Sequence, residues 1–79
     1  MIPTGEQLRA ARALIRMEQT GLATASGVSV DTIKRLEGIK GRVNASAQTL
    51  DAIVKALEAG GAIFIAENGE GPGVRLRKV

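Results

Sequence analysis

The sequence predicts a mainly α-helical domain of four helices, followed by a short C-terminal β-hairpin. Up to about residue 59, apolar residues recur at helical spacing. After Gly60-Gly61 the pattern changes to short β-branched and alternating runs. Phe64 is the only aromatic residue among the 79 residues of the chain, so aliphatic side chains must build the core. A chain of this length has room for one modest core.

The first helix is predicted from about Gly5 to Met17. Thr4 and Gln7 have the spacing of a T-x-x-Q capping box, which satisfies backbone N–H groups at the start of a helix. Leu8 and Ile15 lie on one face of this helix, with arginines between them. The segment is therefore expected to pack that face against the other helices.

Two short helices are expected next. The second runs from residue 18 or 19 to Ser26 and ends at Gly27, because glycine readily adopts the left-handed conformation found after many helices. Ser29 can cap the third helix, which ends at Gly38. Ile33 and Leu36 give this helix its buried side.

A glycine-containing loop then leads to a fourth helix. The loop spans residues 38–45 and has no apolar period. Ser46 can cap the helix that follows, and Gly60-Gly61 ends it. Its apolar stripe consists of Leu50, Ile53, Val54 and Leu57.

The C-terminal segment is predicted to form a hairpin, with strands at residues 62–66 and 74–79 around a glycine-rich turn. A lone hairpin leaves open strand edges and an uncovered apolar face. A second copy of the chain is expected to cover it, and the alternative is a hairpin folded onto its own domain. The residues expected at this dimer contact are Ile63, Phe64, Ile65, Val74 and Leu76.

Composition restricts the possible functions. The chain has 11 Lys and Arg residues against 8 Asp and Glu residues, and the net charge of +3 arises entirely within residues 1–45. That distribution is compatible with nucleic acid binding. Cysteine and histidine are both absent, which removes disulfides, thiol catalysis, histidine acid–base catalysis and the commonest zinc ligands. We expect no enzyme activity, no metal and no cofactor.

The N-terminal residues lack the basic-then-apolar layout of a signal peptide, and no apolar run approaches the roughly 18 residues needed to span a bilayer. A cytoplasmic protein without a membrane partner is expected.

Residues 19–38 are expected to form a helix-turn-helix, in which two short helices are joined through Gly27-Val28-Ser29. Such a unit can place its second helix in the major groove of DNA. Ala23 is small where the helices must approach closely, Val28 fills the junction, and Ile33 anchors the second helix.

These residues spell Gln19-x-x-Leu22-Ala23-x-x-x-Gly27-Val28-Ser29-x-x-x-Ile33-x-x-x-Glu37. The pattern closely resembles the Cro and phage-repressor class of helix-turn-helix proteins, the XRE family. The resemblance covers residues 4 to 60 and implies a four-helix, phage-repressor-like DNA-binding domain at residues 1–61. Residues 62–79 would then be a tail that serves dimerisation.

The resemblance also implies roles for individual residues. Gln19 would hydrogen-bond a phosphate, Lys34 would lie at the groove wall, and Arg12 would form a partly buried ion pair with Glu37. The residues expected to face base edges are Val30, Asp31 and Arg35.

The chemistry of these side chains agrees with base reading. The Arg35 guanidinium can bond both O6 and N7 of guanine. Asp31 can accept from a cytosine amino group, or can instead cap the helix or hold a neighbouring cation. Val30 can contact only an apolar group such as a thymine methyl. The residues expected to contact phosphates are Gln19, Lys34, Lys40 and Arg42.

The function expected from the sequence is a transcriptional regulator that binds specific double-stranded DNA. Repression is favoured because occlusion of a site requires only binding. The chain would bind an inverted repeat as a homodimer, and would be nucleoid-associated when bound. The alternative is an antitoxin-like module whose tail binds a partner protein and whose helices serve autoregulation.

Overall fold

A computed structural model describes residues 1–78 of the chain. It confirms the predicted fold class of four helices followed by a two-stranded antiparallel hairpin. None of the helices within these residues is long and apolar enough to cross a membrane. The elements are α1 (Gly5–Leu14), α2 (Gln19–Ser26), α3 (Val30–Glu37), α4 (Ala47–Ala59), β1 (Ala62–Ile65) and β2 (Gly73–Leu76).

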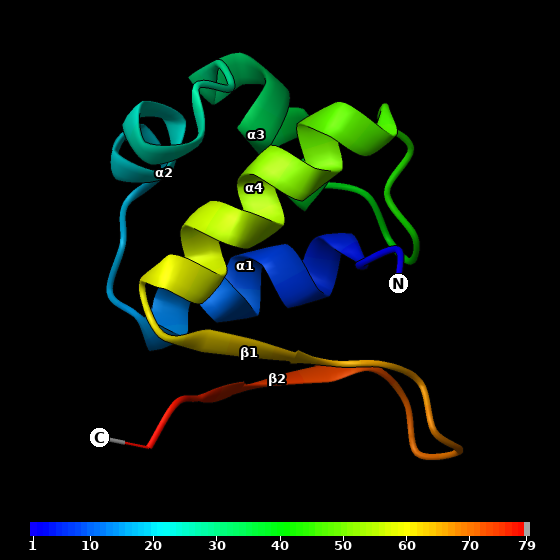
Figure 1. Ribbon diagram of the computed structural model, residues 1–79. Helices are drawn as coiled ribbons and strands as arrows, with labels where there is room; N and C mark the ends of the chain where they lie inside the picture. Colours follow the sequence, from blue (N-terminus) through cyan, green and yellow to red (C-terminus); the bar gives the residue numbers. More distant parts are fainter. Residues whose placement is uncertain (79) are drawn as a thin grey trace.

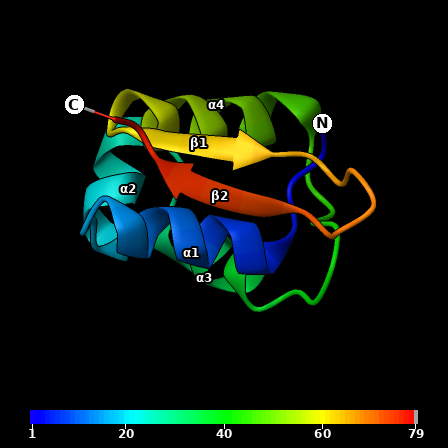
Figure 2. The same ribbon diagram turned by 90° about the horizontal axis from the view of Figure 1, so that it is seen from below.

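The elements form three levels (Figure 1). Helices α2 and α3 lie at the top of this view, α1 and α4 lie in the middle, and the hairpin lies at the bottom. Seen from below, β1 runs along α4 and β2 runs along α1 (Figure 2). The hairpin and α3 are therefore on opposite sides of the domain.

Aliphatic residues from all four helices make up the core. Of the eight aliphatic residues on the predicted apolar helix faces, Ile15 and Val54 are the exceptions, because they are only partly buried. Burying one leucine or isoleucine side chain stabilises a fold by roughly 1.5–3 kcal/mol, so this cluster supplies most of the driving force. Its buried apolar members are Leu8, Ala11, Leu22, Ile33, Leu36, Val43, Leu50, Ile53, Leu57 and Ala62.

Helix α1 ends at Leu14, three residues earlier than predicted. Arg16 takes the left-handed conformation, with φ 56°. The backbone N–H of Arg16 donates to the carbonyl of Ala13 at 3.2 Å, and that of Met17 donates to the carbonyl of Arg12 at 3.0 Å. This hydrogen-bond pattern is a Schellman helix end, which usually has glycine at the left-handed position. The predicted boundary was wrong because no glycine marks it.

Replacing Arg16 by glycine is expected to raise the free energy of unfolding by about 0.5–1 kcal/mol, because glycine adopts positive φ without steric cost. Urea denaturation followed by circular dichroism measures the change. Ala13→Gly is the matched control, since Ala13 is an exposed residue inside α1. That control should lose about 1 kcal/mol. A loss of similar size in Arg16→Gly would contradict the conformational argument.

The turn between α2 and α3 has the predicted structure. Gly27 is left-handed, with φ 75°, and its N–H donates to the carbonyl of Ala23 at 2.9 Å. The Ser29 hydroxyl accepts from the N–H of Thr32 at 3.2 Å and caps α3. Val28 packs against the core between the two helices. Local hydrogen bonds and one apolar contact thus fix how α3 leaves α2.

The loop after α3 is tied to the start of the chain, a contact that the sequence did not predict. The N–H of Gly5 donates to the carbonyl of Gly41 at 3.0 Å, and the N–H of Val43 donates to the carbonyl of Pro3 at 3.1 Å. The Glu6 carboxylate accepts from the N–H of Gly41 at 3.1 Å. Hydrogen bonds from the backbone N–H groups of Glu6 and Gly41 lower the pKa of the Glu6 carboxyl.

The hairpin folds onto its own domain. Phe64 and Val74 are opposite each other in the ladder and pack against the core. They are therefore partly buried against the core of their own chain, and their expected role in a dimer contact stays a prediction. Ile63 and Leu76 are 37% and 54% exposed, and Ile65 is partly buried.

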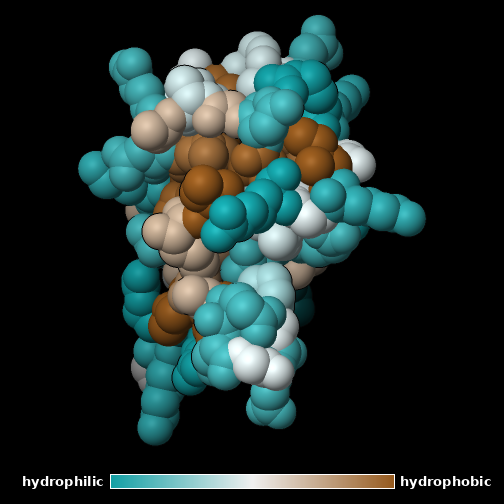
Figure 3. All heavy atoms as spheres, turned by 90° about the vertical axis from the view of Figure 1, so that its right-hand side faces the viewer, coloured by the Kyte–Doolittle hydropathy of each residue, from teal (hydrophilic) through white to brown (hydrophobic). Residues whose placement is uncertain are grey.

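A second group of exposed apolar residues lies beside the N-terminus. Met1 is 64% exposed and Ile2 is 47% exposed. On the side of the molecule at the right of Figure 1, apolar side chains gather in the middle of the surface, with polar and charged side chains around them (Figure 3). Two of the three most exposed large apolar residues are thus on this side and not on the hairpin.

Candidate nucleic-acid interface

Helix α3 has a buried apolar side and an exposed charged side. Ile33 and Leu36 are 1% and 0% exposed. Asp31, Lys34 and Arg35 are exposed. Val30, at the start of the helix, is partly buried. Because side chains three and four residues apart share a helix face, α3 presents one continuous polar surface away from the core.

A hollow of about 410 Å³ lies between the beginnings of α2 and α3. It brings Gln19, the first residue of α2, to the same depression as Lys34 and Val30 of α3. Glu18, Thr20 and Arg12 complete its lining. Two of the predicted phosphate ligands are therefore neighbours on the face that α3 presents.

Behind this hollow, Arg12 of α1 and Glu37 of α3 form a two-point ion pair. Arg12 Nε donates to Glu37 Oε2 at 2.7 Å, and Arg12 Nη2 donates to Glu37 Oε1 at 2.9 Å. The side chain of Glu37 is only 3% exposed, against 22% for Arg12. The hydrogen bond to Glu37 raises the pKa of the Arg12 guanidinium above its usual value. Arg12 Nη1 also donates to the carbonyl of Met17 at 3.0 Å.

Gln19 joins this pair, a contact that the sequence did not predict. Its Nε2 donates to Glu37 Oε1 at 3.1 Å. The carboxylate of Glu37 thus links α1, the start of α2 and the end of α3. Nε2 carries two hydrogens, and the bond to Glu37 uses one of them. The sequence gives no local signal for this contact, because Gln19 and Glu37 are 18 residues apart. Only the folded structure shows that they are partners.

The two loop cations occupy different places. Lys40 is exposed and follows the end of α3 closely. Arg42 forms an isolated β-bridge with Thr4 and lines a pocket of about 390 Å³ together with Ala66 and Pro72 from the hairpin end. Arg42 thus lies beside the hairpin end, on the loop that is anchored to the start of the chain.

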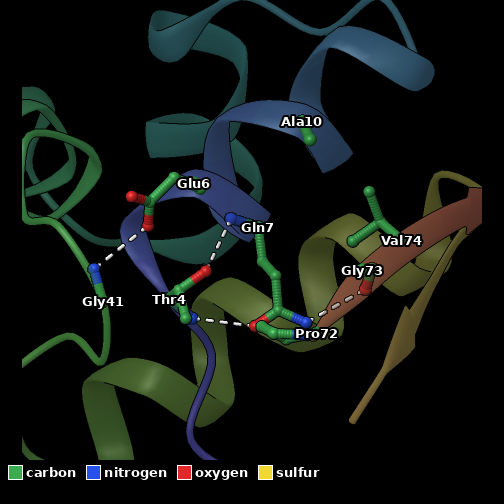
Figure 4. A pocket seen from close by; sticks show the side chains of 8 residues that line it. All are labelled: Thr4, Glu6, Gln7, Ala10, Gly41, Pro72, Gly73 and Val74. Atoms are coloured by element: carbon green, nitrogen blue, oxygen red, sulfur yellow. Dashed lines mark hydrogen bonds between the residues drawn. The ribbon is translucent and has the colours of Figure 1, made fainter. Parts of the chain in front are cut away.

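A larger pocket of about 660 Å³ lies between α1 and the hairpin (Figure 4). Its central polar group is Gln7, which is 3% exposed. Gln7 Nε2 donates to the carbonyls of Ile65 at 3.1 Å and Gly73 at 3.0 Å, and Oε1 accepts from the N–H of Thr4 at 2.8 Å. The predicted capping box is therefore present, and the same side chain also fastens the end of the hairpin to α1.

Comparison with known families agrees with this geometry. A family model described as a helix-turn-helix domain matches residues 4–62, which span α1 through to the first residue of β1. No curated protein matches the chain. The chain therefore belongs to the helix-turn-helix domain family of DNA-binding regulators.

Proposed function

We propose that this chain is a transcriptional repressor of the Cro and phage-repressor (XRE) class, which binds an inverted-repeat operator as a homodimer. The observation that carries the proposal is the two-sided α3, with Ile33 and Leu36 buried and Lys34 and Arg35 exposed. A helix held this firmly by its apolar side can enter a major groove without losing its packing.

In this proposal, Arg35 is the principal base reader. Its guanidinium is exposed, and Arg35 forms no ion pair within residues 1–78. It can therefore form a two-point contact with the O6 and N7 of guanine. Asp31 and Val30 lie at the start of the same helix, where a cytosine amino group and a thymine methyl are the complementary groups.

Phosphate contacts are assigned to Gln19, Lys34 and Lys40. The hollow between α2 and α3 supports the first two, because it places both side chains beside the base-reading helix. Arg42 is left out because its pocket is shared with the hairpin end. Each phosphate contact releases counterions, so binding is expected to weaken steeply as the salt concentration rises.

Repression would follow from occupancy of the operator. Residues 1–61 would bind DNA, and residues 62–79 would form the hairpin tail. Helix-turn-helix families of this kind are typically non-enzymatic. An antitoxin-like role would require a partner protein, and no observation favours it over DNA regulation.

Replacing Arg35 by alanine is expected to remove roughly 1–3 kcal/mol of discrimination between the cognate site and other DNA, because a two-point base contact is lost. Selection of bound DNA from a random library first identifies the site. Fluorescence anisotropy with the selected and a scrambled duplex then measures both affinities.

Arg9→Ala is the matched control, since Arg9 is an exposed arginine on α1 and the charge change is the same. The control should keep its preference for the selected site, while both variants should still bind nonspecifically at low salt. If Arg35→Ala discriminates as well as the control, Arg35 does not read bases. If the wild-type chain selects no DNA at all, the proposed function fails.

A further inference from the structure

We infer that the second copy of the chain docks on the surface beside the N-terminus and not on the hairpin. This inference rests on the proposed function, because it names the partner surface of the DNA-binding dimer. The surface, here called the N-terminal face, consists of Met1, Ile2, Ala47, Val54, Ala66 and Pro72, which line two adjoining pockets.

The N-terminal face is apolar and accessible. Met1 and Ile2 lie in both pockets and are largely exposed, at 64% and 47%. Val54, at the edge of the buried side of α4, is only partly buried. Figure 3 shows the apolar side chains as a gathered patch and not as scattered single residues. A gathered apolar patch with a polar rim is typical of a protein contact surface.

The charges at the edge of this face are complementary to a second copy of itself. Arg42 and Glu67 line the same pocket from different segments, one from the loop after α3 and one from the loop after β1. Neither forms an ion pair within residues 1–78. At a two-fold contact, a residue that lies away from the axis meets a different residue of the second copy. Arg42 can therefore meet Glu67 of the second copy, twice per dimer.

The hairpin does not have this complementarity. Ile63 is paired with Arg75 in the ladder and shares its outward face. Arg77 and Lys78 follow, and no acidic residue occurs in residues 71–78. Two copies meeting through this surface would bring like charges together, which opposes association.

The direction of α3 also distinguishes the two surfaces. The hairpin lies on the opposite side of the domain from α3, and the N-terminus lies to the side of both (Figure 1). Two copies stacked hairpin to hairpin would point their α3 helices away from each other. Alternatively, the two copies meet at the N-terminal face, and the two-fold axis runs from the hairpin side of the domain to its α3 side. In that arrangement both α3 helices point in the same direction.

The size of the domain fits the second arrangement. Its extents are 32 × 30 × 19 Å. The centres of two copies lying side by side along a longer dimension are about one domain width apart. That separation is close to the roughly 34 Å between successive major grooves on one side of DNA.

Sedimentation equilibrium of the full chain without DNA tests the inference. Ile2→Asp should weaken dimerisation roughly tenfold or more, because it buries a charge in the apolar contact. Leu76→Asp is the matched control on the hairpin, where 54% of the residue is exposed, and it should leave dimerisation unchanged. Ala66→Lys gives a second test at an exposed position, in case Ile2→Asp disturbs the adjacent anchored loop.

Charge reversal tests the orientation of the two copies. Arg42→Glu alone and Glu67→Arg alone should each weaken the dimer, and their combination should restore it. The inference would be overturned if Leu76→Asp dissociates the dimer but Ile2→Asp and Ala66→Lys do not. It would also be overturned if the wild-type chain stays monomeric at high micromolar concentration. A wild-type dimer that Ile2→Asp dissociates supports the interface even if no DNA site is selected, so the two proposals can fail separately.

Discussion

Arg12→Ala is expected to lower the free energy of unfolding by about 3–5 kcal/mol, because it leaves the buried carboxylate of Glu37 without its cation. Among residues 1–78, Gln19 would then be the only one whose side chain donates to that carboxylate. A domain of this size has a stability of about 4–12 kcal/mol, so the loss is a large part of the total. Thermal and urea denaturation, followed by circular dichroism, measure it.

The exposed ion pair between Asp51 and Lys55 provides the control. Lys55 Nζ and Asp51 Oδ2 are 3.1 Å apart, but the side chains of Asp51 and Lys55 are 61% and 73% exposed. Lys55→Ala should therefore change stability by about 0.5 kcal/mol or less. The double substitution Arg12→Met with Glu37→Leu should recover most of the loss, because it removes both charges and keeps apolar volume. A cost below about 1 kcal/mol for Arg12→Ala would show that Glu37 is not held by this pair.

Gln7→Glu is expected to destabilise the domain by about 3–5 kcal/mol at neutral pH, although the two side chains have nearly the same shape. The substitution replaces the NH₂ group that donates to Ile65 and Gly73 by an oxygen that faces both carbonyls. Denaturation curves of variant and wild type, compared at several pH values, measure the effect.

The direction of the pH dependence follows from the protonation of the introduced carboxyl. Its neutral form can donate one hydrogen bond, so folding should raise its pKa above the unfolded value of about 4.3. The stability difference from wild type should be smallest below that value and should grow as the pH rises through the folded-state pKa. Gln48→Glu, at an exposed position in α4, should show no such loss. A pH-independent difference would indicate that Gln7 acts only by filling space.

The local elements were predictable because their signals lie within a few residues. Ser29 and Ser46 cap the helices that they precede, and Gly27 is left-handed where α2 ends. The end of α1 was not predictable, since the left-handed residue there is Arg16. Local patterns fix the start and end of a helix only where the residue type matches the conformation.

Long-range contacts between polar groups were predictable only in part. The resemblance to a repressor class implied the Arg12–Glu37 pair, and the structure contains that pair at 2.7 Å. Gln19 joins it, and Gln7 reaches the hairpin 58 and 66 residues away, with no sequence signal. A glutamine looks the same in a sequence whether it faces solvent or a buried carbonyl, so only the fold assigns its partner.

The contact between α1 and the hairpin has a consequence for synthesis of the protein. Helix α1 leaves the ribosome before the hairpin, against which it packs through hydrogen bonds from Gln7 to the carbonyls of Ile65 and Gly73. Until residue 76 has emerged, that side of α1 has no cover, and the nascent chain exposes apolar surface. Closing a loop of this length also slows folding relative to a bundle with only local contacts. Helix α1 and the hairpin therefore complete the domain together, after translation of the hairpin.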